Sequence, residues 1–225
     1  MFFYNDPTFL LLIPALLLTL YAQFKVKSTF AKYSEINSKS GKTAAEVSRL
    51  ILDSAGLRTI PIQEVEGDLT DNYDPRDKTL HLSRSVYNSQ SVAAIGVAAH
   101  EAGHAIQDAK AYAPMALRQN LVPAANLGSQ MAIPLFFMGL IFSLPMLMDI
   151  GIIAFSLAVA FQAVTLPVEF NASSRAIKVL SNYLAQDEIP MARQVLNAAA
   201  LTYIAAAAMA VLNLIRLIIL RDRRD

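Results

Sequence analysis

The chain has 225 residues, of which 55% are hydrophobic and only 16% carry a charge. Soluble domains usually contain about 25% charged residues, so this composition excludes an ordinary soluble protein. The formal net charge of +1 gives no reason to expect a nucleic acid partner, and the absence of Cys excludes disulfides, thiolate metal sites and a Cys nucleophile.

Four apolar segments follow one another along the chain. They are residues 9–24, 131–148, 150–166 and 198–220. A spanning helix needs about 20 apolar residues, so the first segment is short, and a signal peptide is the alternative. The cations Lys25 and Lys27 follow this segment, however, whereas a signal peptide carries its cations in front. Asp149 and Gly151 predict a tight turn between the second and third segments. We therefore expect a mainly α membrane protein with about four transmembrane helices, of which the middle two form a hairpin.

The sequence between the first two segments, residues 25–130, predicts a small α+β domain. Thr43 and Glu46 have the spacing of a capping box, which predicts the start of a helix. Ser89 or Ser91 is the expected N-cap of a second helix.

Two short runs between these helices, residues 59–65 and 79–82, predict strands, and the turn-rich residues 71–77 separate them. The second run is expected at an edge of the sheet. There it could pair with an extended substrate as an added strand, or serve as an ordinary edge.

The second helix carries the sequence H-E-x-x-H, with His100, Glu101 and His104 at its fixed positions. Residues four apart lie on one face of a helix, so both imidazoles can bind one Zn²⁺ while Glu101 acts on the attacking water. The chain has only 3 His, and the motif's neighbours are small and apolar, which argues against a chance pair on a solvated surface. We therefore expect a zinc site.

A catalytic zinc site uses three protein ligands, so one more is needed. His81 could supply it from a strand, although its alternation with leucines is more typical of a solvent-facing strand residue. We favour Glu169, a carboxylate directly after the third apolar segment, with a helix-start role as the alternative. Glu46 and Asp108 are weaker candidates, because Glu46 has its capping role and Asp108 could instead bond a ligand histidine.

Several segments resemble the neutral zinc metallopeptidase family of bacterial membrane proteins, the YugP-like group. They are residues 91–108, 69–71, 73–75, 166–170 and 196–203. This resemblance covers almost the whole chain. More distantly, the pattern is similar to that of the gluzincins HtpX and CAAX prenyl protease. It implies a zincin-like peptidase domain in which His100, His104 and Glu169 bind zinc and Glu101 is the base.

One position differs from the distant relatives. They carry an Asp four residues after the ligand Glu, and this chain has Ser173 at that position. The partner that orients a ligand histidine is therefore open among Asn171, Ser173 and Arg175. Arg175 and Tyr183 are candidate donors to the developing oxyanion.

These observations divide the chain into an N-terminal transmembrane helix, a zinc peptidase domain, a transmembrane hairpin, a helical segment with the third ligand, and a last transmembrane helix with a charged tail. The expected ranges are 1–24, 25–130, 131–168, 169–197 and 198–225. Lys25, Lys27 and Lys32 follow the first span, so the positive-inside rule predicts a cytoplasmic peptidase domain in a multi-pass protein of the bacterial cell membrane.

The expected function is that of a membrane-embedded, zinc-dependent endopeptidase that hydrolyses membrane or membrane-proximal proteins. Its expected partners are a protein or peptide substrate and the lipid bilayer. A non-catalytic zinc-binding scaffold is the alternative, although it would normally close its site with a fourth protein ligand. A channel or transporter would need paired intramembrane charges or broken repeats.

Overall fold

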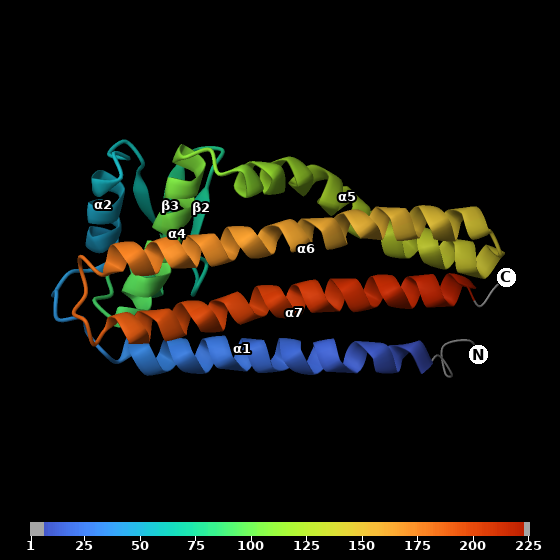
Figure 1. The fold of residues 1–225 in the computed structure, drawn as a ribbon, viewed down its shortest axis with the longest axis horizontal. Coiled ribbons are helices and arrows are strands. Elements are labelled where there is room, and N and C mark those ends of the chain that lie inside the picture. Colours follow the sequence, from blue (N-terminus) through green and yellow to red (C-terminus); the bar gives the residue numbers. More distant parts are fainter. Residues whose placement is uncertain (1–6, 223–225) are drawn as a thin grey trace. The chain divides into compact units, whose positions relative to one another are not determined.

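A computed structural model describes residues 7–222, so the first apolar residues and the last three residues of the charged tail lie outside the described part. Its elements are η2 (Pro7–Leu12), α1 (Ile13–Ser34), α2 (Ala44–Ser54), β1 (Ile62–Val65), β2 (Asn72–Asp74), β3 (Thr79–Ser83), α3 (Arg84–Tyr87), α4 (Val92–Ala109), α5 (Ala113–Phe142), α6 (Pro145–Leu180) and α7 (Ile189–Asp222) (Figure 1). The expectation of a mainly helical protein with one small sheet is confirmed.

The chain forms two compact units. Among the described residues, the span unit comprises residues 7–22, 116–167 and 202–222, and the sheet unit comprises residues 23–115 and 168–201. The long helices α1, α5, α6 and α7 each contribute residues to both units.

Four helical stretches of the described chain are long and apolar enough to cross a membrane, as expected. They are Pro7–Ser34, Ala113–Phe142, Pro145–Leu180 and Ile189–Asp222. Each exceeds the length of about 20 residues that a bilayer requires.

The turn between α5 and α6 was predicted at the wrong place. It lies at Ser143, which has a positive φ of 56°, and Pro145 then begins α6. Proline suits a first helical turn because its missing N–H has no partner there in any case. Gly151 lies inside α6, where a Cβ would approach the carbonyl oxygen of Ala132 to 2.8 Å. This glycine therefore serves close helix packing in the span unit.

Two arginines of α7 have partners within the span unit. Arg216 is buried, places its guanidinium 3.8 Å from the centre of the Phe9 ring and donates to Thr8 Oγ1 at 3.2 Å. Arg221 Nε lies 2.9 Å from Asp149 Oδ1. These contacts give each cation a local partner next to apolar side chains.

The three strands of the sheet unit have the order β1-β3-β2, with β1 parallel and β2 antiparallel to β3. The strand expected at the edge, β3, is therefore the central strand. Because both of its sides are paired, β3 cannot accept a substrate strand. The two predictions for this segment, a substrate-binding edge and an ordinary sheet edge, are therefore both wrong. The strand β2 arises within the segment expected to be turns; pairing with β3 and the burial of Tyr73 hold it in place.

Capping residues set the starts of both helices that pack in this unit. Thr43 N donates to Glu46 Oε2 at 2.8 Å and Thr43 Oγ1 accepts from Glu46 N at 3.2 Å, so the predicted capping box is confirmed. Of the two candidate serines, Ser91 is the N-cap of α4 and accepts from Ala94 N. Nearly every side of α4 is buried, which its run of Ala, Gly and Val residues permits.

Candidate metal centre

Helix α4 brings His100 and His104 together on one face. Their ring centroids are 4.7 Å apart, with the rings nearly perpendicular. Both side chains are buried. Two buried imidazoles in an apolar helix need polar partners to offset their loss of water, and the structure provides one for the Nδ1 atom of each ring.

Helix α6 supplies the third side chain. Glu169 Oε2 lies 3.1 Å from His100 Nε2 and 3.5 Å from His104 Nε2, and Glu169 is only 2% exposed. The approach is possible because Gly103 lets α4 pack against the backbone of Ala172, where a Cβ would lie 2.8 Å from the carbonyl oxygen. Glu169 lies in the interior of α6, which excludes the alternative that it begins a helix.

The geometry of this group fits a zinc ion. One ligand atom from each of the three residues lies within 4.8 Å of the others. Ligands about 2.0–2.1 Å from a tetrahedral zinc are roughly 3.3 Å apart, close to the observed separations of 3.1 and 3.5 Å. Two imidazoles and one carboxylate are a donor set of catalytic zinc sites, so His100, His104 and Glu169 could hold this metal.

Gln107 orients His104. Its Oε1 lies 2.9 Å from His104 Nδ1, while its Nε2 donates to the carbonyl oxygen of Val168 at 2.8 Å. Since that carbonyl can only accept, the amide orientation is determined, and Nδ1 of His104 must carry the proton. His104 Nε2 is then left with a lone pair for a metal. Gln107 was not among the site residues predicted from the sequence, where the available signal is a Gln one turn after His104 in an otherwise apolar helix.

Ser173 contacts the other histidine, with its Oγ 3.1 Å from His100 Nδ1. Among the three candidates for this role, it is therefore the one in contact with a ligand. Asn171 acts one step further out, because its Oδ1 accepts from Gln107 Nε2 at 3.0 Å and from Arg175 Nε at 2.7 Å. Such outer partners fix the orientation of metal ligands.

Glu101 does not belong to the group of three ligand residues. Its Oε2 accepts a hydrogen bond of 3.1 Å from the backbone N–H of Tyr73 in β2. The side chain is partly exposed, yet burial of its carboxyl group raises the pKa above the ordinary value for Glu. A carboxylate that is held beside a metal site without filling a ligand position is suited to proton transfer.

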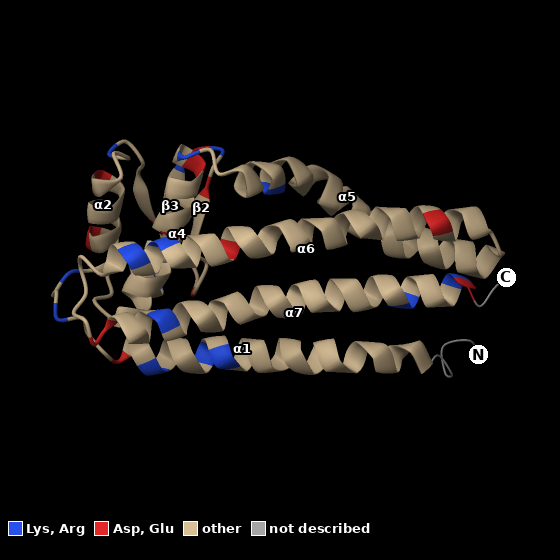
Figure 2. Ribbon diagram, viewed as in Figure 1, with Lys and Arg blue, Asp and Glu red and all other residues tan. Residues whose placement is uncertain are grey.

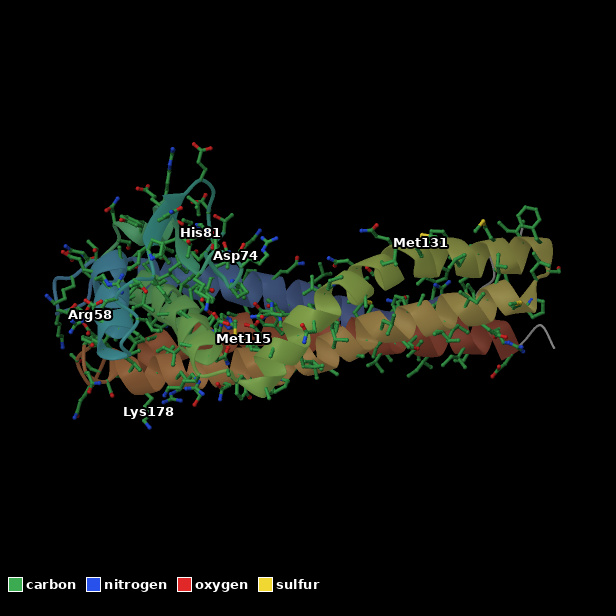
Figure 3. All side chains as sticks on the ribbon, turned by 90° about the horizontal axis from the view of Figure 1, so that it is seen from above. Arg58, Asp74, His81, Met115, Met131 and Lys178 are labelled. Atoms are coloured by element: carbon green, nitrogen blue, oxygen red, sulfur yellow. The ribbon has the colours of Figure 1, made fainter. Side chains whose placement is uncertain are left out.

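The remaining candidates lie elsewhere. His81 is in β3 and has its Nε2 3.8 Å from Asp77 Oδ2, and it does not belong to the metal-ligand group found in the described chain (Figure 3). Glu46 has its capping role. Asp108 accepts from Tyr73 Oη at 2.8 Å rather than from a ligand histidine, and Tyr183 donates to the carbonyl oxygen of Leu50.

Comparison with known proteins gives two findings. Residues 8–222 match the model of a family described as "Putative neutral zinc metallopeptidase". The "Putative membrane protease YugP" of Bacillus subtilis (strain 168) is 46% identical over 212 residues, which cover 93% of this chain and 94% of that protein. No solved structure gives a significant match. The resemblance seen in the sequence is thus confirmed over nearly its whole length.

Proposed function

Because the chain belongs to the neutral zinc metallopeptidase family, we propose that it is a zinc-dependent endopeptidase of the membrane. The observation that carries this proposal is the meeting of His100, His104 and Glu169 from two helices, with Glu101 beside them and bonded elsewhere. A scaffold that keeps zinc for structure alone has no use for this additional carboxylate.

Each side chain has a distinct role in the proposed reaction. Zinc bound by the three ligands would supply a Lewis acid that activates water for attack on a peptide carbonyl. Glu101 takes the proton of that water on its carboxylate and returns it to the leaving amine. The Tyr73 N–H holds Oε2 of Glu101 and leaves Oε1 for this exchange. The raised pKa suits a group that must both accept and release the proton.

The sheet supports a binding direction for the substrate. Since β3 is paired on both sides, an extended peptide can add only to the outer edge of β1 or β2. On β2, the N–H of Tyr73 is directed at Glu101 rather than at β3, so this edge lies beside the proposed base. We therefore assign the β2 edge, in place of β3, as the position where the scissile peptide lies.

The continuity of α6 supports membrane-proximal substrates. Glu169 follows the third apolar segment by only three residues and lies in the same unbroken helix, Pro145–Leu180. A zinc ion held there would be roughly one helix diameter, ~10 Å, from the hydrocarbon edge. Tethering enzyme and substrate to one bilayer raises their effective concentration. The cations after the first span favour a cytoplasmic face.

The decisive experiment measures zinc content and peptide cleavage by the purified full-length protein, with and without a chelator. We expect cleavage that is lost on chelation and restored by zinc. Glu101→Gln should abolish cleavage and keep the zinc, whereas Glu64→Gln, on the exposed side of β1, should change neither. Stoichiometric zinc without cleavage of any peptide would favour the scaffold, and substantial activity of Glu101→Gln would refute Glu101 as the base.

A second measurement addresses the substrate class. Reconstituted enzyme should cleave a reporter fused to a membrane anchor faster than the same reporter free in solution. Equal rates would remove the argument for membrane-proximal substrates and leave the peptidase assignment intact.

A further inference from the structure

A groove of about 390 Å³ lies between α6 and α7 within the sheet unit. Each helix lines it with residues spaced three or four apart, such as Phe170, Ser174 and Lys178 on α6 and Arg193, Asn197 and Ala200 on α7. This spacing places each set on one helix face. The volume is within the range of sites that bind small molecules.

One end of the groove is cationic. Lys178 is near the end of α6 and Arg193 near the beginning of α7, on both sides of the turn that joins these helices. Figure 2 shows Lys or Arg positions near these ends of both helices. Both are exposed, and Lys178 extends away from its helix (Figure 3). Among the described residues, neither has a carboxylate partner. Two unpaired cations at one cavity favour an anionic ligand.

The polarity of the groove changes along its length. By position along the two helices, Ile177 and Leu196 accompany the two cations. Ser173, Ser174 and Asn197 come next, and Phe170 and Ala200 form the far end. Beyond that end, α6 and α7 continue into their most apolar sequence, residues 150–166 and 201–220. The cations therefore lie toward the turn between the two helices, and the groove ends on apolar residues on the side where both helices enter this sequence.

We propose that this groove binds a phospholipid with an anionic headgroup. Lys178 and Arg193 contact its phosphate, the hydroxyl of Ser174 and the amide of Asn197 contact the glycerol region, and an acyl chain passes Phe170. A soluble phosphate would use only the cationic end. A zwitterionic lipid has no net negative charge to offset the two cations, whereas a singly anionic headgroup offsets one of them. Basic pockets between membrane helices are suited to such headgroups.

The test uses the full-length protein in detergent, titrated with phosphatidylglycerol, with phosphatidylcholine of the same acyl chains, and with inorganic phosphate. Bound lipid is counted by native mass spectrometry. We expect phosphatidylglycerol to bind at least tenfold more tightly than the other two. The double variant Lys178→Gln/Arg193→Gln should lose roughly thirtyfold of this affinity, which corresponds to about 1 kcal/mol for each cation.

Two variants control for charge and for folding. Lys25→Gln/Lys27→Gln removes the same charge from exposed positions on α1, outside the groove, and should change the affinity less than twofold. Asn197→Trp narrows the groove without changing its charge and should also weaken lipid binding. Equal losses in both double variants, equal binding of the two lipids, or equal binding of phosphate and phosphatidylglycerol would each overturn the proposal. These readouts do not depend on peptidase activity.

Discussion

Replacing Gly103 by Ala tests whether the close approach of α4 and α6 builds the metal site. The new Cβ would lie 2.8 Å from the carbonyl oxygen of Ala172, whereas ordinary contacts begin at 3.4 Å. The helices must therefore separate by about 0.6 Å, the difference between these two distances. Zinc–ligand distances tolerate only about 0.2 Å. Because His100 and His104 flank Gly103 and Glu169 precedes Ala172 by three residues, this separation moves ligands on both helices apart.

Gly96→Ala is the matched control, because Gly96 lies on the same helix with its nearest neighbour, Ala192 Cβ, at an ordinary 3.6 Å. Both substitutions stabilise the helix by about 1 kcal/mol through helix propensity. The difference between the two variants in the free energy of unfolding therefore gives the steric cost, which is about 1–3 kcal/mol for overpacking. Thermal unfolding should place Gly103→Ala about 2–12 °C below Gly96→Ala, and metal analysis should show zinc loss only in Gly103→Ala. Equal zinc contents and equal midpoints would refute the packing argument.

Other substitutions test the ligands and their partners. Glu169→Ala should abolish tight zinc binding, whereas His81→Ala should leave it unchanged; metal analysis that showed the reverse would make His81 the third ligand. Gln107→Leu should weaken zinc binding about 10–100-fold by releasing His104, and it should lower stability by about 1–3 kcal/mol because Val168 O loses its donor. Zinc titration of the folded variant checks this, and an unchanged affinity would show that Gln107 does not orient the histidine.

Features that depend on local sequence could be predicted. The four spans follow from hydropathy alone, and the capping box at Thr43 and the Ser91 cap satisfy backbone groups within one helical turn. The pairing of His100 with His104 needs only the helical repeat. In each case the interacting groups lie within a few residues of one another, so the sequence pattern contains the whole interaction.

Features that depend on distant partners were predicted poorly. The strand β2 contains Asn and Asp, which favour turns, and its extended form depends on pairing with β3. The central position of β3 likewise follows from neighbours on both sides. Gly151 resembles a turn residue in sequence, yet it is required by the approach of Ala132 from another helix. Local patterns do not distinguish a glycine that turns the chain from one that admits a neighbour.

The groups that bond the Nδ1 atoms of the two histidines also depend on a distant contact. They explain why this chain has Ser173 where the distant relatives have an Asp. Both Nδ1 atoms meet neutral groups, an amide at His104 and a hydroxyl at His100. A neutral partner fixes the ring but adds less electron density to the ligand than a carboxylate would. The site already holds the buried Glu169 and the partly exposed Glu101 in an alanine-rich setting, where each further carboxylate would have to be desolvated. Ser173 and Gln107 thus orient both histidines without adding negative charge, at positions that become recognisable only once α4 and α6 are in contact.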